Sequence, residues 1–262
     1  MKPIETAEAK KIQIEILDKI VSFCEENNLR YYLAYGTLLG AVRHKGYIPW
    51  DDDIDIHMPR PDYERFIATF NTPNGKYNVV THEQERRYHV PFAKVYRKGT
   101  IVNEFFYKQS VFGVYVDIFP LDGIKSTKQA YWCGQCIRFM YIKTSIFNNR
   151  QALARKLRLA VTKLILLPFS SHFILKTMRR IATRYKFEEC EHVCSFGSRT
   201  ALREILPRTV FDNHSTMEFE GKDYRIPAGY DCYLTHKYGN YMELPPVEKR
   251  ISTHDSQGYW IE

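Results

Sequence analysis

The sequence predicts an α+β fold: a mixed β-sheet core flanked by helices, with a basic helical insertion. Short apolar segments typical of strands alternate with amphipathic helical patterns in the first 123 residues. Residues 123–187 contain 14 Lys or Arg and no Asp or Glu, although the whole chain has 38 basic and 30 acidic residues. We therefore divide the chain into a core (residues 1–123), a basic helical insertion (124–190) and a C-terminal part (191–262) that completes the core.

The first predicted elements are a long helix and a strand. Residues 5–28 have an amphipathic pattern that is expected to pack against the sheet. Its apolar stripe consists of Ile12, Ile16 and Ile20. Residues 29–34 form an apolar, aromatic segment typical of a strand, which Gly36 ends.

A glycine–threonine turn follows this strand and suggests a phosphate-binding site. Thr37 is expected to cap a short helix over residues 38–44. The free N–H groups of Gly36 and Thr37, together with the helix dipole, would favour a phosphate there. Arg43, on the same helix, is a further candidate phosphate ligand.

An acidic segment comes next, and the chain resumes as a strand over residues 53–56. Because strand side chains alternate between faces, Asp51, Asp53 and Asp55 are expected to project one way while Ile54 enters the core. Carboxylates about 4 Å apart repel each other by on the order of 4 kcal/mol per pair at an effective dielectric constant of about 20. Such a face is either exposed and screened, or neutralised by a cation. All-oxygen ligands suit Mg²⁺ or Mn²⁺.

A phosphate cradle beside a carboxylate-held metal ion is typical of phosphoryl or nucleotidyl transfer. The alternative for the acidic segment is a solvated surface turn without a bound ion. The spacing of the glycine turn, the helix and the acidic strand favours the metal site.

The remaining core elements supply two more candidate residues. They are a helix over 59–70 and strands over 77–81, 90–96, 100–106 and 111–119. Asp117 lies within a strongly apolar strand, where a buried carboxylate needs a partner or a metal. We interpret Asp117 as a further acid of the site, with a salt bridge at a strand end as the alternative. Lys94 is either a phosphate partner in the same cleft or a solvated lysine on a strand.

The segment GTLLGAVRHKGYIPWDDDIDI, residues 36–56, resembles the signature of the LicD family. That family includes bacterial phosphocholine transferases and the fukutin-type transferases. The resemblance continues through FAKVYRKGT, VYVDIFPLDG and YGNYMELPPVEKR, and covers most of residues 30–122 and 225–255. It implies a nucleotidyltransferase-like fold and transfer of a phospho-alcohol from a CDP-linked donor onto a glycan. It also places Asp117 at the family's late catalytic acid position.

From the residues and the resemblance we expect a Mg²⁺-dependent enzyme, with Mn²⁺ as a substitute. It would move phosphocholine from CDP-choline to a sugar hydroxyl of a lipid-linked teichoic acid or other cell-surface glycan precursor, releasing CMP. The expected catalytic acids are Asp53, Asp55 and Asp117. The expected metal ligands are Asp51, Asp53, Asp55 and Asp117. The expected donor-binding residues are Gly36, Thr37, Arg43 and Lys94.

Three alternatives remain open at the level of the sequence. The donor could carry ribitol or glycerol phosphate, the reaction could be nucleotidyl transfer with release of pyrophosphate, or the chain could be a non-catalytic membrane-bound scaffold. A choline group would need an aromatic cage. The aromatic residues near the motifs are Tyr35, Tyr47, Trp50, Phe105 and Tyr107.

The basic insertion suggests a location at a membrane. Its apolar run over residues 164–169 is too short to span a bilayer. We expect residues 150–186 to rest on an anionic membrane surface, with a helical hairpin packed on the core as the alternative. No nucleic-acid motif accompanies the charge, so no nucleic-acid partner is expected.

The N-terminus is polar and has no secretory signal, and the chain has six cysteines. We therefore expect a cytoplasmic protein, peripheral on the inner face of the membrane, with reduced thiols. A four-thiolate zinc site is the less favoured alternative to core thiols. It would use Cys133, Cys136, Cys190 and Cys194.

Two C-terminal segments are candidates for the walls of a substrate site. The stretch SFGSRTALREILPRTVF from Ser195 resembles a stretch of the family and is expected to line the acceptor side. The tail is expected to close over the donor diphosphate, or else to lie on the surface. Its candidate residues are Tyr238, Gly239, Pro245, Pro246, Lys249 and Arg250, with His254 as a weaker acid–base candidate.

Overall fold

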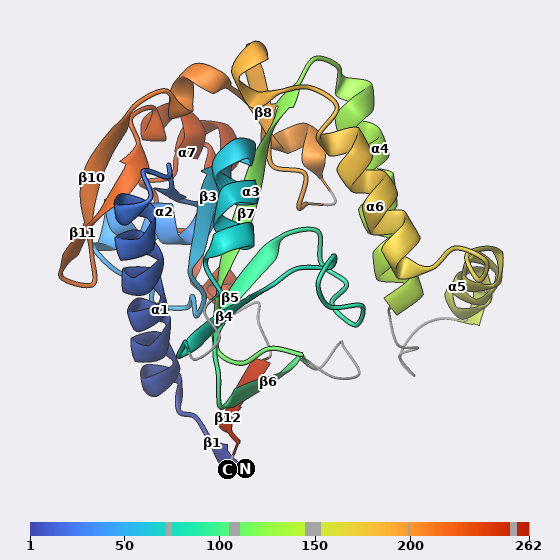
Figure 1. Ribbon diagram of the computed structural model, residues 1–262, viewed down its shortest axis with the longest axis horizontal. Coiled ribbons are helices and arrows are strands. Elements are labelled where there is room, and N and C mark those ends of the chain that lie inside the picture. The colour runs from blue at the N-terminus through green and yellow to red at the C-terminus, as the bar shows by residue number, and fades with distance from the viewer. Residues whose placement is uncertain (72–74, 105–110, 145–152, 199, 252–255, 262) are drawn as a thin grey trace.

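The computed structural model describes residues 1–71, 75–104, 111–144, 153–198, 200–251 and 256–261. Its centre is a mixed sheet with the strand order β2-β3-β7-β5-β4 (Figure 1). These strands are β2 (Tyr32–Leu33), β3 (Asp55–Pro59), β7 (Tyr115–Ile124), β5 (Ala93–Arg97) and β4 (Tyr77–Val80). Strands β3 and β7 are parallel and the other pairs along this path are antiparallel. The predicted α+β class and mixed sheet are confirmed.

Two helices cover one face of this sheet. They are α1 (Thr6–Glu26) and α3 (Arg60–Thr69). The predicted apolar stripe of α1 is buried through Ile12, Ile16 and Ile20. Phe23 of α1 packs edge-on against Phe66 of α3, with ring centroids 5.6 Å apart. The amphipathic pattern therefore identified α1 and its buried face, and the helix predicted over 59–70 is confirmed as α3.

Smaller elements complete the core around the sheet. Helix α2 (Tyr35–His44) contacts α7 (Tyr230–Tyr238) and the hairpin of β10 (His214–Phe219) and β11 (Lys222–Pro227). At the other end, a three-stranded sheet joins the two termini through β1 (Lys2–Pro3), β12 (Ser256–Trp260) and β6 (Thr100–Glu104) (Figure 1). The C-terminal end of β7 pairs with β8 (His192–Cys194), and β8 pairs with β9 (Ile205–Pro207). The 3₁₀ turns are η1 (Phe187–Glu189), η2 (Ala201–Glu204), η3 (Arg208–Phe211) and η4 (Val247–Lys249).

The basic segment is helical, as predicted. It contains α4 (Thr127–Thr144), α5 (Leu153–Ile165) and α6 (Ser171–Ala182). Helices α4 and α6 lie side by side, whereas α5 lies beyond their ends, away from the sheet (Figure 1). Across the described residues, none of the helices combines the length and the apolar character needed to cross a membrane.

A network of ion pairs connects these helices to the core. Arg60 at the start of α3 makes a bidentate pair with Asp122 of β7, at 2.6 and 2.7 Å. Arg60 also bonds Glu64 at 3.1 Å, and Glu64 in turn accepts a 2.8 Å bond from Arg179 of α6. The Asp122 side chain is 1% exposed. The insertion is thus held to the sheet by a chain of ion pairs that runs from the shielded Asp122 to the partly exposed Glu64 and Arg179.

Several element boundaries differ from the sequence predictions. The strand predicted over residues 29–34 is limited to Tyr32–Leu33, and β3 begins at Asp55 rather than at residue 53. Helix α2 begins at Tyr35, whose N–H donates to the Tyr233 hydroxyl at 3.1 Å. Thr37 therefore lies inside the first turn, and the prediction that it caps the helix is wrong. The distant Tyr233 hydroxyl satisfies the first N–H, which local sequence could not reveal.

Cys232 is exposed, whereas among the four cysteines considered for a zinc site Cys133, Cys190 and Cys194 are buried and Cys136 is half-buried. Cys133 donates to the Met178 carbonyl at 3.8 Å, and Cys194 donates to the Ala201 carbonyl at 3.3 Å. Burial raises the pKa of both thiols. Over the part of the chain that the structure describes, no cysteine cluster has the spacing of a metal site, and the thiols fit the expectation of core residues.

Candidate active site

A cleft of about 1180 Å³ lies at the start of β3 and β7. One wall carries Gly36, Arg43, Asp51, Asp53, Asp55 and Asp117. A second wall comes from the C-terminal part and includes Gly197, Ser198, Thr200, Glu204, Lys237, Tyr238, Pro245, Pro246 and Lys249. The cleft thus unites the acidic motif with both C-terminal segments that the sequence singled out.

Strand register places three charged residues next to one another on the sheet. Asp55 of β3 is the partner of Asp117 of β7, and Asp117 is the partner of Lys94 of β5. The Lys94 Nζ donates to Asp117 Oδ1 at 2.6 Å. Asp117 is buried, as predicted, and it lines the cleft. It also forms the salt bridge that the sequence analysis gave as the alternative to a role in the site. Lys94 is buried too, 3.4 Å from the centroid of the Tyr115 ring, so it is not a solvated lysine.

The acidic wall has an unfavourable concentration of negative charge. Burial raises the pKa of the Asp55 carboxyl well above its ordinary value, and the charges of Asp53, Asp117 and Asp51 raise it further. Lys94 acts in the opposite direction. A positive ion at this wall would offset the repulsion among the carboxylates.

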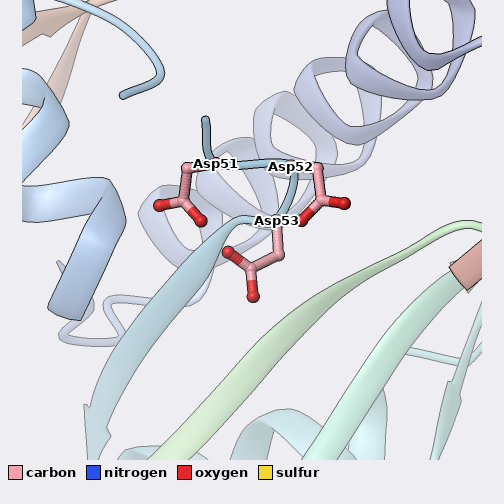
Figure 2. A group of neighbouring side chains, drawn as sticks. All are labelled: Asp51, Asp52 and Asp53. Atoms are coloured by element: carbon pink, nitrogen blue, oxygen red, sulfur yellow. The ribbon is translucent and has the colours of Figure 1, made fainter. Parts of the chain in front are cut away.

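The segment before β3 is a loop in which three adjacent acids converge. Asp51, Asp52 and Asp53 each offer a carboxylate oxygen, and these oxygens lie within 4.8 Å of one another (Figure 2). The Gln13 amide donates to the Asp52 carbonyl at 2.9 Å and ties this loop to α1. The donor set consists of oxygen only and is half-buried, which fits Mg²⁺ or Mn²⁺.

This geometry differs from the predicted strand face. In a strand, Asp52 would point away from Asp51 and Asp53, but in the loop all three carboxylates approach each other. Sequence reasoning therefore missed Asp52, although the run of three aspartates was the signal. Asp55 and Asp117 are more buried and lie outside this group of three. Metal binding by Asp51, Asp53, Asp55 and Asp117 stays a prediction.

The glycine turn supports the acidic loop directly. A methyl group added at Gly36 would overlap the Asp51 carboxylate. The Thr37 hydroxyl accepts the Asp55 N–H at 2.8 Å, which fixes α2 to the start of β3. The N–H groups of Gly36 and Thr37 belong to the first turn of α2, where a helix supplies no acceptors of its own. Their predicted contact with phosphate rests on these N–H groups.

Arg43 lines the cleft and holds the C-terminal segment. Its Nη1 donates to the carbonyls of Tyr241 and Glu243, at 2.7 and 3.3 Å. Contact between Arg43 and a phosphate stays a prediction. In the structure, Arg43 positions the segment around Tyr241 and Glu243, which forms part of the second wall.

Glu204 and Lys237 form an ion pair that sequence reasoning missed. The Lys237 Nζ donates to Glu204 Oε1, and both residues line the cleft. The Glu204 side chain is 2% exposed, and the Lys237 Nζ lies 4.7 Å from the centroid of the Tyr35 ring. Both residues come from segments that resemble the family, but no local pattern distinguished them from other charged residues there.

The aromatic residues considered for a choline cage have different locations. Tyr35 and Trp50 line the cleft, together with other aromatic side chains. Tyr47 instead packs on Phe219, with ring centroids 5.1 Å apart. Phe105 and Tyr107, like the acid–base candidate His254, lie outside the described residues. The cleft-lining aromatic residues are Tyr35, Trp50, Phe92, Phe119, Tyr141, Tyr238 and Tyr241.

The predicted C-terminal tail forms part of the cleft. Tyr238, Pro245, Pro246 and Lys249 line it, and the Arg250 guanidinium lies 5.7 Å from the Trp50 ring centroid. The tail is therefore not a detached surface segment. Its closure over a donor diphosphate stays a prediction.

Residues 28–161 match the family model described as "LicD/FKTN/FKRP, nucleotidyltransferase domain". The chain belongs to the LicD family. The matched region contains the acidic loop, Lys94 and Asp117, and the resemblance inferred from the motifs is confirmed.

Curated proteins similar to this LicD-family chain support the same assignment. The chain is 30% identical over 269 residues to "Lipopolysaccharide cholinephosphotransferase LicD" of Haemophilus influenzae, and the match covers 99% of each chain. Short segments also match two uncharacterised proteins. One, from Rickettsia typhi, is 54% identical over 41 residues, which is 16% of this chain and 13% of the relative. The other, from Rickettsia prowazekii, is 57% identical over 37 residues, which is 14% of each.

Proposed function

We propose that this LicD-family protein is a divalent-metal-dependent transferase. It moves phosphocholine from CDP-choline to a sugar hydroxyl of a cell-surface glycan precursor, such as a lipid-linked teichoic acid, and releases CMP. The observation that carries this proposal is a cleft of about 1180 Å³ whose lining combines Asp51, Asp53, Asp55 and Asp117 with the cationic Lys237. The full-length similarity to a cholinephosphotransferase supports the choice of phosphocholine.

The acidic wall would hold the metal ion through Asp51, Asp53, Asp55 and Asp117. When bound, Mg²⁺ or Mn²⁺ would neutralise charge on the donor diphosphate and on the leaving phosphate. Asp52 lies close enough to Asp51 and Asp53 to join this ligand set.

The residues around the acids would orient the donor. The N–H groups of Gly36 and Thr37 would contact a phosphate at the start of α2. Lys237 and Arg43, which also line the cleft, would approach the same diphosphate. Lys94 is bound to Asp117 and its side chain is 5% exposed, whereas the Lys237 side chain is 23% exposed and lines the cleft although it pairs with Glu204. We therefore assign Lys94 to holding the Asp117 carboxylate rather than to the donor.

The acceptor hydroxyl would attack the β-phosphorus of CDP-choline. A bond forms between the sugar oxygen and this phosphorus, and the bond from the phosphorus to the bridging oxygen breaks. CMP leaves with the bridging oxygen, and Asp117 accepts the hydroxyl proton or completes the metal site. Most of the rate enhancement would come from positioning and charge stabilisation.

The location that fits this reaction is the cytoplasmic face of a membrane, where a lipid-linked acceptor and a soluble nucleotide donor meet. We propose that the protein is peripheral there and contacts the anionic surface through residues 150–186. The excess of basic residues in the insertion supports this placement.

Identification of the products tests the proposal. The protein is incubated with Mg²⁺, a lipid-linked amino-sugar acceptor and, in turn, CDP-choline, CDP-ribitol, CDP-glycerol or a nucleoside triphosphate. Products are followed by chromatography and by ³¹P NMR. We expect CMP and a phosphocholine ester from CDP-choline, with much lower turnover of the other donors.

Two results would replace the proposal. Turnover of CDP-ribitol or CDP-glycerol equal to that of CDP-choline would make the protein a transferase of another phospho-alcohol. Pyrophosphate from a nucleoside triphosphate, without CMP from any CDP-alcohol, would indicate nucleotidyl transfer. The family model's description as a nucleotidyltransferase domain makes that the specific second candidate.

A further inference from the structure

We propose that α5 and the turn after it form a docking surface that inserts among the lipids of an anionic bilayer. Four apolar side chains of α5 are 50–67% exposed: Leu157, Val161, Leu164 and Ile165. Their spacing in sequence puts them on one side of the helix. A helix that packs on its own protein turns such a stripe toward the core, whereas α5 turns it toward the solvent.

The apolar surface continues past the end of α5. Leu167, Phe169 and Phe173 are 67%, 44% and 51% exposed, and the rings of the two phenylalanines are 5.8 Å apart. This stretch leads from α5 into the first turn of α6. We name these seven side chains the α5 patch. Exposed apolar surface of this extent on one element is typical of a docking site.

Charge identifies the partner as an anionic bilayer. The insertion carries 14 basic residues and no acidic ones between positions 123 and 187. At about 100° per residue, backbone position 158 borders the stripe and positions 156 and 163 fall on the opposite side of the helix, and all three are Lys or Arg. An apolar stripe on one side of a helix and basic residues on its polar side are the pattern of a helix that lies in a lipid interface. A second copy of the chain would bring the same positive charge against this face and would be repelled.

The α5 patch is fixed in relation to the cleft. Lys143, near the end of α4, donates to the carbonyls of Leu166 and Phe169 and so holds the turn between α5 and α6. Tyr141, two residues earlier on α4, lines the cleft. The last turn of one helix therefore connects the docking surface with the active-site opening. Under the proposed function, on which this purpose rests, a bilayer-anchored acceptor would reach the cleft while the protein is docked.

Vesicle co-sedimentation tests the surface on the full chain. The vesicles are phosphatidylcholine alone, or phosphatidylcholine with roughly 30 mol% phosphatidylglycerol. The test variant is L164Q/I165Q, and the matched control is L202Q/I261Q, which makes the same kind of change at side chains that are 50% exposed elsewhere. Circular dichroism establishes that both variants are folded.

We expect the wild type and the control to bind the anionic vesicles at about 0.1 M salt, and to bind less at about 0.5 M salt. The vesicle affinity of L164Q/I165Q should fall about tenfold. Equal binding by L164Q/I165Q and the wild type would overturn the proposal, as would wild-type binding that is the same with and without phosphatidylglycerol. A dimer in vesicle-free solution that only L164Q/I165Q loses would show that the α5 patch is a contact between copies.

A second pair of measurements separates this surface from the proposed reaction. Asp53→Asn should bind vesicles like the wild type while losing CMP release. L164Q/I165Q should keep CMP release with a soluble acceptor. If the wild type binds anionic vesicles but releases no CMP from any CDP-alcohol, the proposed function fails while the docking surface stands.

Discussion

The position of the Asp51 carboxylate depends on the absence of a side chain at Gly36. Because a methyl group there would overlap the carboxylate, the glycine has a role separate from backbone flexibility. The sequence pattern placed Gly36 in a phosphate turn, but it could not show that the glycine also makes room for an acid fifteen residues later. Such a close approach depends on the folded path of the loop before β3.

Gly36→Ala should therefore displace Asp51 and weaken the metal site. We expect CMP release at saturating donor to fall at least tenfold, with partial recovery at high Mg²⁺ concentration. The matched control is Gly258→Ala, where an added methyl meets neighbours only at ordinary contact distances of 3.4 and 3.6 Å. Wild-type activity of Gly36→Ala at limiting Mg²⁺ would contradict this role.

Asp53→Asn separates folding from function at the acidic wall. Among the neighbouring charges, that of Asp53 contributes most to the raised pKa of Asp55. Removing it therefore relieves repulsion in the metal-free protein. We expect the free energy of unfolding in EDTA to rise by about 1 kcal/mol, while CMP release is abolished. Chemical denaturation and the CMP assay measure the two effects. Glu191→Gln, at an exposed position, controls for the loss of one negative charge. If Asp53→Asn lowered the free energy of unfolding in EDTA, repulsion between Asp53 and Asp55 would not be the dominant effect.

At the scale of elements, patterns identified the helices before α7 and the strands from β2 to β7, because a period of 3.6 or 2 residues is a local property. They did not identify α7, β1 or the strands from β8 to β12. They placed Asp117 in a buried strand and Lys94 on another strand of the sheet. They could not pair Asp55 with Asp117 or Asp117 with Lys94, because strand order and register depend on distant segments. The same limit applies to Glu204 and Lys237, whose ion pair joins η2 to α7.

The bidentate pair of Arg60 and Asp122 is expected to be important for joining α3 to β7. Arg60→Met would leave the nearly inaccessible Asp122 carboxylate without its partner, and we expect a loss of about 3–5 kcal/mol in the free energy of unfolding. R60M/D122L, which removes both charges, should recover most of this loss. Urea denaturation monitored by circular dichroism gives the values.

The exposed pair of Lys76 and Glu15, at 2.6 Å, provides the control for that cycle. Lys76→Met should change stability far less, because solvent screens exposed charges. Equal losses for Arg60→Met and Lys76→Met would mean that burial of the Asp122 carboxylate does not determine the energy of its pair.

At the scale of the whole molecule, acidic and basic residues are concentrated in different parts of the chain. Acidic residues gather at the strand ends that open into the cleft, and basic residues gather in the insertion. The division of charge was evident in the sequence because the insertion is continuous. The composition of the cleft was only partly evident, because its two walls come from segments about 150 residues apart. The α5 patch needed the structure, because exposure of an apolar stripe depends on what packs against it.

The central claim is that the acidic wall carries out metal-dependent transfer from CDP-choline. The most direct measurement is CMP release from CDP-choline with a lipid-linked amino-sugar acceptor, in Mg²⁺ and in EDTA, by the wild type and by Asp55→Ala. We predict CMP in Mg²⁺ from the wild type only, with no release in EDTA or from the variant. Equal CMP release in EDTA, or by Asp55→Ala, would contradict the claim.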